Sequence, residues 1–258
     1  GSADIQAVRA GKAGLMVDHT TTGVHEMAYV YTDDGFHAPD MTILAEHITK
    51  GGIKELTYQK HPQPVIWAPR NDGVLVGMTY NREQNVIGWH RHEIGGHTDT
   101  GSPLPVVVES VTCIPSQDLT YYEVWIVARR RIGGATKRFI ERSAKPWQAG
   151  DTTGRHCYLD AAAYSVPDAL GTTIGPFWHL VGETVSIQVN GCIEPDQVVP
   201  ASGYLTVSRP ASAYAVGFAY NSDGQQLRNN AGAANGTAQG KTQRTHRLTF
   251  RLYETGQL

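Results

Sequence analysis

Residues 65–92 read VIWAPRNDGVLVGMTYNREQNVIGWHRH, and this stretch decides the fold class. Three runs rich in β-branched and aromatic residues are separated by NDG at 71–73 and by NREQN at 81–85. Asn, Asp and Gly favour tight turns, because they tolerate left-handed backbone angles or hydrogen-bond to their own backbone. The pattern therefore predicts a three-stranded antiparallel meander, which is most of a propeller blade.

Similar runs recur outward from this meander. They occupy residues 14–19, 24–32, 53–59, 106–114, 122–131 and 136–142. Short strands at intervals of about 10–12 residues are typical of sandwiches, barrels and propellers. We expect an all-β protein whose first domain, residues 1–147, consists of propeller-like antiparallel meanders.

One segment, PDMTILAEHIT at residues 39–49, breaks the alternating pattern. Its apolar side chains recur at helical spacing, Asp40 is suited to be an N-cap, and Gly51-Gly52 would stop a helix. The apolar side chains are those of Met41, Leu44, Ala45 and Ile48. We therefore predict one short helix near 40–49.

The composition changes at SAKPWQAGDTTGR, residues 143–155, where small, polar and Pro or Gly residues predominate. We place a domain boundary there. Strand patterns then resume at residues 183–193, 203–208, 213–220 and 244–254, and Asn190-Gly191 is a strong hairpin signal. They predict a second domain, residues 148–258, that is a small β-barrel or β-sandwich. Residues 228–242 lack an apolar anchor and predict a flexible loop.

Charge and composition exclude several classes of protein. The chain has 258 residues and a formal net charge of −2, so its bulk electrostatics indicate neither a nucleic-acid binder nor a membrane-surface protein. No apolar run approaches the roughly 18–20 residues of a membrane span. The three cysteines, Cys113, Cys157 and Cys192, are too widely spaced for a disulfide framework or a C-x-x-C motif. Whether Cys157 and Cys192 pair stays open.

Three histidines and a glutamate lie within HRHEIGGH, residues 90–97. A zincin needs H-E-x-x-H on a helix, because that spacing places both imidazoles on one helical face. Here the spacing from His92 to His97 is one residue too long, and Gly95-Gly96 disfavours a helix. His90 and His92 would share one face of a strand, but no third ligand stands out. We predict packed or surface histidines, with a metal site at His90, His92 and His97 as the less favoured alternative.

Other chemical motifs are incomplete. GTAQGKT, residues 236–242, is one residue short of the phosphate loop G-x-x-x-x-G-K-[ST], and an alternating strand pattern follows it instead of a helix. No G-x-S-x-G motif is present, and no pair of carboxylates is singled out. We predict no catalytic residues and no cofactor.

The segment ARRRIGGATKRFIERSAK, residues 128–145, has the pattern of a hairpin with two basic arms. Its cations include Arg129, Arg130, Arg131, Lys137, Arg138 and Arg142, against Glu141 alone. The favoured interpretation is a solvated hairpin or inter-subunit salt bridges. The alternative is a patch that faces nucleic acid, since clustered Lys and Arg neutralise phosphates of any sequence.

Long phrases of the chain carry a resemblance to a known family. AVRAGKAGLMVDHTTTGVHEMAYVYTDDGFHAPDMTILAEHI, PVIWAPRNDGVLVGMTYNREQNVIGWHRHEIGG and EVWIVARRRIGGATKRFIER resemble the tail nozzle, or tail tubular, proteins of short-tailed bacteriophages. FWHLVGETVSIQVNGCIEPDQVV resembles the small FCCH-like β-domain that follows in these proteins, and GTAQGKTQRTHRLTFRLYETG resembles a phrase near their C-terminal end. The resemblance covers nearly the whole chain.

The resemblance implies a structural role and no catalytic residues. Copies of such a protein form a ring, often of six, that extends the tube through which phage DNA leaves, and the ring docks neighbouring tail proteins. We expect a virion component made in the cytoplasm of the host bacterium. Family members are longer, and Gly1-Ser2 is typical of a cleaved tag, so we expect a C-terminal portion of a longer protein.

Two other functions remain as alternatives. The first is a receptor- or glycan-binding module at the tail tip, for which Trp89, Trp147, Trp178 and Tyr220 are the candidate aromatic platforms. The second is a tail-associated hydrolase.

Overall fold

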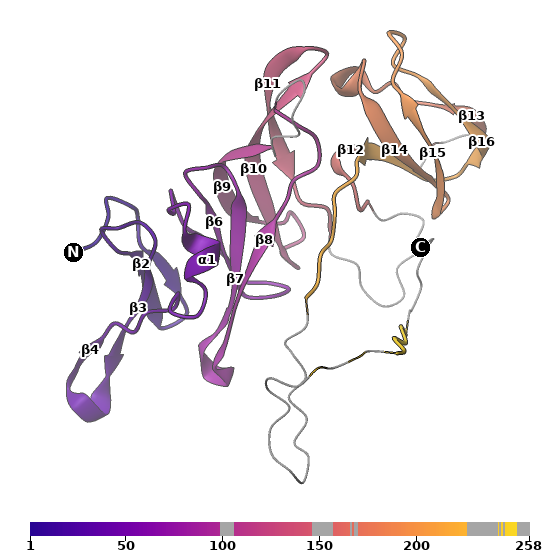
Figure 1. The fold of residues 1–258 in the computed structure, drawn as a ribbon. Coiled ribbons are helices and arrows are strands. Elements are labelled where there is room, and N and C mark those ends of the chain that lie inside the picture. Colours follow the sequence, from indigo (N-terminus) through magenta and orange to yellow (C-terminus); the bar gives the residue numbers. More distant parts are fainter. Residues whose placement is uncertain are drawn as a thin grey trace. The chain divides into compact units, whose positions relative to one another are not determined.

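The computed structural model describes residues 1–98, 106–145, 157–165, 167, 170–225, 242, 244 and 246–251. The chain divides into two compact units, Gly1–Tyr220 and Asn221–Leu258. The first unit is built mostly from antiparallel sheets (Figure 1), which confirms the prediction of an all-β protein. The boundary predicted between residues 147 and 148 lies outside the described residues, so the division into domains 1–147 and 148–258 stays a prediction.

The strand predicted over residues 244–254 is wrong for the part of it that the structure describes. Residues 246–251 belong to no strand, and the side chains of Leu248 and Phe250 are exposed. An alternating sequence forms a strand only where a neighbouring strand accepts its backbone hydrogen bonds. Most of the loop predicted at 228–242 lies outside the described residues.

Two four-stranded sheets open the first unit, and in each the strands pair in sequence order. The first sheet consists of β1 (Val8–Ala10), β2 (Ala13–Val17), β3 (Val24–Val30) and β4 (Gly35–His37). The second sheet consists of β5 (Thr57–Gln59), β6 (Val65–Pro69), β7 (Leu75–Asn81) and β8 (Val86–His92). The meander predicted over residues 65–92 is thus confirmed as β6, β7 and β8, to which β5 adds a fourth strand.

The second sheet repeats the first in register. Gly14 pairs with Met27 and Tyr29 with Phe36 in the first sheet. At the same places in the second sheet, Ile66 pairs with Met78 and Tyr80 with Ile87. Residues of β7 and β8 follow their counterparts in β3 and β4 by 51 positions.

The turns of the two sheets repeat as well. A 3-10 turn joins β3 to β4 and β7 to β8, at Tyr31–Asp33 and Arg82–Gln84 respectively. Each turn ends in one left-handed residue, Asp34 (φ 46°) or Asn85 (φ 53°). Asp and Asn are the non-glycine residues that accept this conformation most readily. The two sheets are therefore copies of one structural unit.

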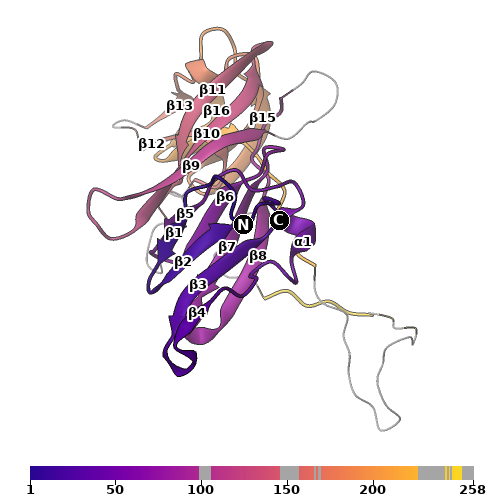
Figure 2. The ribbon, with the colours of Figure 1, turned by 90° about the vertical axis from the view of Figure 1, so that its left-hand side faces the viewer.

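The sheets stack face to face, as Figures 1 and 2 show for the first and second. Leu15, Val17 and Val24 of the first sheet share a core with Ile66 and Met78 of the second.

The opposite face of the second sheet, which carries Trp67 and Leu75, packs against the third sheet. The third sheet has the order β11 (Ala135–Arg142), β10 (Tyr122–Ile132), β9 (Val107–Pro115). The second sheet is thus covered on both faces.

The predicted helix near 40–49 is shorter than expected, since α1 spans only Glu46–Thr49. Asp40 caps a turn and not a helix: its Oδ1 accepts hydrogen bonds from the backbone N–H of Thr42 at 2.7 Å and from the Thr42 hydroxyl at 2.5 Å. Leu44, which the helical stripe placed in the core, is 92% exposed. Side chains such as Asp and Thr compete with helical hydrogen bonding in this way.

Six further strands form two sheets around a separate core. One sheet has the order β12 (Asp160–Ser165), β17 (Tyr214–Phe218), β14 (Thr184–Val189), β15 (Cys192–Val198). The other pairs β13 (Gly171–Ile174) with β16 (Leu205–Ala211).

The hairpin predicted at Asn190-Gly191 is confirmed between β14 and β15, and both of its turn residues have positive φ. Ile132 and Phe139 of the β10–β11 hairpin pack into this core, which attaches it to the third sheet.

Candidate functional site

The predicted histidine cluster forms a packed pair, not a three-residue site. His90 and His92 lie on the face of β8 that points toward the third sheet, and His90 Nδ1 is 2.7 Å from His92 Nε2. A side chain at Gly77 would collide with the His90 ring, so this glycine makes the space that the imidazole fills. The ring of Trp67 lies 4.7 Å from that of His92. Both histidines therefore serve the contact between sheets.

His97 has a different role from this pair: its backbone C=O accepts a hydrogen bond from the N–H of Arg131 at 2.8 Å. Within the described ranges, no three His, Cys, Asp or Glu side chains are grouped so that they could hold a metal ion. Burial lowers the pKa of His90, and burial together with the neighbouring His90 lowers the pKa of His92 to about 4. The pair is consequently neutral near pH 7.

The basic hairpin is confirmed as β10 and β11, joined by a turn at Gly133-Gly134. Four of its five arginines pair with carboxylates of this chain, and two of the four share Glu109. Arg129 Nε and Arg138 Nε lie 3.1 and 2.7 Å from the two carboxylate oxygens of Glu109 on β9, which lowers the pKa of Glu109. Arg142 forms an ion pair with Glu123 at 3.0 Å. Of the other predicted patch members, Lys137 is exposed and Arg131 is half-buried.

Arg130 cannot belong to a surface patch, because its side chain is fully buried. Its guanidinium forms a bidentate ion pair with Glu141, and its Nε donates to the C=O of Gly95 at 2.8 Å. The N–H of the same Gly95 donates to Asp160 Oδ2 at 2.7 Å. The guanidinium carbon of Arg130 lies 6.0 Å from the ring centre of Phe218. The Arg130 cluster, defined as these five residues, ties the third sheet to strands β12 and β17.

The four predicted aromatic platforms have different environments. Trp89 is part of the core between the first two sheets and donates its Nε1–H to the C=O of Met41 at 2.9 Å. Trp178 is exposed beside Gly203, and Trp147 lies outside the described residues. Tyr220, half exposed, lines a cavity. Only Tyr220 and Trp178 therefore stay available as platforms among the described candidates.

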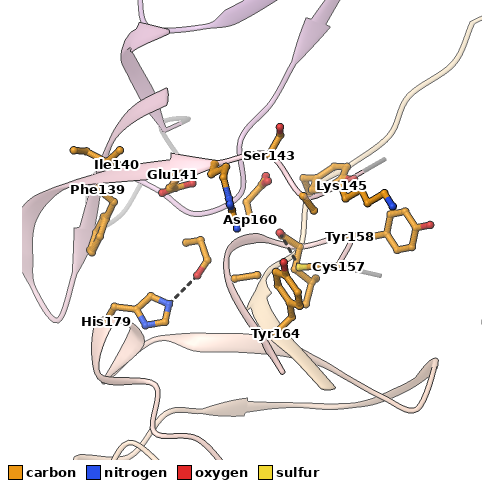
Figure 3. Close-up of a pocket in the computed structure, with 16 residues that line it drawn as sticks. Phe139, Ile140, Glu141, Ser143, Lys145, Cys157, Tyr158, Asp160, Tyr164 and His179 are labelled. Atoms are coloured by element: carbon orange, nitrogen blue, oxygen red, sulfur yellow. Dashed lines mark hydrogen bonds between the residues drawn. The ribbon is translucent and has the colours of Figure 1, made fainter. Parts of the chain in front are cut away.

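The cavity that Tyr220 lines has a volume of about 590 Å³ (Figure 3). Its walls come from the end of β11 and the residues after it, from residues 157–162 and Tyr164, and from His179 in the 3-10 turn Trp178–Leu180. These segments are distant in the sequence, and no local motif marks them. The cysteine in its wall, Cys157, is free, as are Cys113 and Cys192, and burial raises the pKa of its thiol.

Two comparisons of the sequence with known proteins found no match. No protein-family model matches the chain, and no curated protein matches it in a sequence search. Within the part of the chain that the structure describes, none of the helices has both the length and the apolar character that crossing a membrane requires.

Proposed function

We propose that this chain is a structural component of a bacteriophage tail, part of the wall of a nozzle or tube through which DNA leaves. Its copies would form a ring, which in the family that the sequence resembles is often of six, and would dock neighbouring tail proteins. It would be assembled in the host cytoplasm and act in the virion. The proposal requires rigid repeated modules, extended packing surfaces and weak binding to DNA.

The single observation that carries this proposal is the in-register repeat of the first two sheets. Consecutive four-stranded meanders that stack face to face are the arrangement of successive propeller blades. In such an array each sheet offers one face to the preceding sheet and one to the following sheet. The second sheet has neighbours on both faces, as a blade in the middle of an array does.

The outer face of the first sheet supports an array that continues. Met27 and Tyr29 lie there at the positions where the second sheet presents Met78 and Tyr80 to the first. Met78 and Tyr80 are 0% and 4% exposed, whereas Met27 and Tyr29 are 39% and 48% exposed. Medium-sized and aromatic side chains on such a face are suited to pack against another sheet.

The paired charges of the β10–β11 hairpin favour a passive wall over a DNA-binding patch. Each phosphate contact strengthens binding only where a cation is free to replace the counterions of DNA. Here Arg129, Arg138 and Arg142 already face carboxylates, and the net charge of the chain is −2. A conduit must let DNA slide, so a wall on which several cations are already paired suits that task.

The test joins particle mass in solution to location in the virion. Light scattering on the purified chain should show a ring-sized oligomer, or oligomerisation when neighbouring tail proteins are added. Immunogold labelling of intact phage particles should place the protein at the tail. A chain that stays monomeric with those proteins and is absent from purified virions would overturn the proposal.

A further inference from the structure

The cavity beside β12 has walls that suit a particular class of ligand. Three tyrosines surround it, and Tyr158, Tyr164 and Tyr220 are 55%, 53% and 42% exposed. Tyr220 shares this lining with Asp160 and Cys157, and burial raises its pKa. Figure 3 shows Tyr158, Tyr164, Cys157 and Asp160 among the residues that line the cavity. Partly exposed tyrosines provide flat apolar surfaces with polar edges.

Hydrogen-bonding groups are held in place among these aromatic rings. Asp160 is anchored through Oδ2 by the N–H of Gly95, and burial raises the pKa of its carboxyl group. His179 Nε2 lies 2.9 Å from the C=O of Ala161 (Figure 3). A carbonyl oxygen only accepts, so Nε2 of His179 donates this hydrogen bond, which holds the ring in place. Polar side chains held in place, as those of Asp160 and His179 are, suit the hydroxyl groups of a ligand.

Two charged side chains on the β11 side of the cavity already have partners within the protein, and a third, Lys145, is exposed in the lining. Glu141 is paired with Arg130, and Arg142 is paired with Glu123 and lies against the ring of Trp125. A strongly anionic or cationic ligand would gain little from groups whose charge is balanced within the protein. The two paired charges and the partly exposed tyrosines therefore favour a ligand without strong charge that has flat apolar faces and carries many hydroxyl groups.

We propose that this cavity binds a neutral oligosaccharide. One or two sugar rings would stack their C–H faces on Tyr158, Tyr164 and Tyr220, while their hydroxyls bond to Asp160 and His179. A volume of about 590 Å³ lies within the range of small-molecule sites. The site would give a tail component a contact with a glycan surface, and it does not depend on the tube-wall role.

The test uses an array of defined neutral and acidic oligosaccharides probed with the purified full chain. The neutral oligosaccharide with the strongest signal is then titrated by saturation-transfer NMR and calorimetry. Tyr164→Ala and Tyr220→Ala should each weaken its binding at least about tenfold, the loss expected for one aromatic contact. Tyr31→Ala is the matched control: Tyr31 is 88% exposed on the turn between β3 and β4, and this variant should bind like the wild type.

Thermal denaturation of every variant distinguishes lost binding from lost folding. Asp160→Asn, which keeps an acceptor for the N–H of Gly95, should also weaken binding while the chain melts at the wild-type temperature. The proposal is overturned if no neutral oligosaccharide binds, if acidic glycans alone bind, or if the three tyrosine variants bind equally. A screened peptide library that selects binders dependent on Tyr164 and Tyr220, with no neutral glycan bound, would identify a peptide site instead.

Discussion

The first and second sheets have the same register and the same turns, yet residues at matching positions differ in burial. Met78 and Tyr80 are buried because the first sheet covers them, whereas Met27 and Tyr29 stay exposed. Since strand geometry is common to both, the neighbouring sheet and not the strand decides which residues form core. Local sequence thus specifies the module, and the stacking order specifies the core.

The largest expected difference between the sheets concerns the paired methionines. Met78→Ala should lower the free energy of unfolding by about 2–5 kcal/mol, because it leaves a cavity in a closed core. Met27→Ala, at the matching exposed position, should change it by no more than about 0.5 kcal/mol. Urea denaturation followed by circular dichroism measures both. Equal losses would contradict the assignment of the outer face.

The histidine pair has no counterpart in the first sheet and should make the second sheet sensitive to acid. The pKa of His92 is lowered to about 4, below the value of about 6.5 in an unfolded chain. The unfolded state then binds the proton more readily, so stability should fall as the pH drops from about 6.5 toward 4. The loss is at most about 3 kcal/mol.

Comparison of the wild type with His92→Gln isolates the contribution of His92 to the pH dependence of stability, because the carboxyl groups titrate equally in both proteins. Chemical denaturation at pH 7, 6, 5 and 4.5 should show that the free energy of unfolding falls less with decreasing pH in the variant than in the wild type. Parallel curves over that range would show that His92 titrates normally in the folded chain.

A smaller difference concerns the paired tyrosines. The Tyr80 hydroxyl donates to Glu26 Oε2 at 2.7 Å across the two sheets, where Arg82 also pairs with Glu26 at 2.8 Å. Tyr80→Phe should therefore lower the unfolding free energy by about 1.5–3 kcal/mol, the range for a hydrogen bond to a charged group. Tyr29→Phe loses only an exposed hydrogen bond to Asp34 and should be nearly neutral. Thermal melts of the two variants provide the measurement.

The smallest expected effect is a gain. Gly14 stands where the second sheet has Ile66, its backbone φ is not positive, and a Cβ there would meet only the Met27 carbonyl, at 3.9 Å. Gly14→Val should raise the unfolding free energy by about 0.5–1 kcal/mol, because glycine weakens strand interiors. A loss of stability on this substitution, measured by urea denaturation, would mean that the outer face is already packed in solution.

The strands and hairpins could be predicted from the sequence, because alternation and turn residues are local signals. The repeat was harder to find, since only Met and Tyr at 27 and 29 recur at 78 and 80 while most other positions differ. The helix was over-predicted because the turn that Asp40 and Thr42 form is invisible to apolar periodicity.

The candidate site was harder still to predict. The excess of positive charge in residues 128–145 is reduced once Glu109 and Glu123 lie beside it, and that pairing depends on strand register. The burial of Arg130 and the cavity of Figure 3 depend on contacts among segments scattered along the chain. Tyr220 was identified as an aromatic candidate, but its neighbours Tyr158 and Tyr164 had no local signal.

The position of Gly95 between Arg130 and Asp160 has a consequence for hydrogen exchange. One residue of a loop gives its C=O to a buried guanidinium and its N–H to a partly buried carboxyl group. A Cβ at this position would lie 2.7 Å from the C=O of Ala219, so no larger residue fits. The amide proton of Gly95 should therefore exchange as slowly as those of the surrounding strands. Its exchange rate reports, at a single atom, whether the third sheet and strand β12 remain attached.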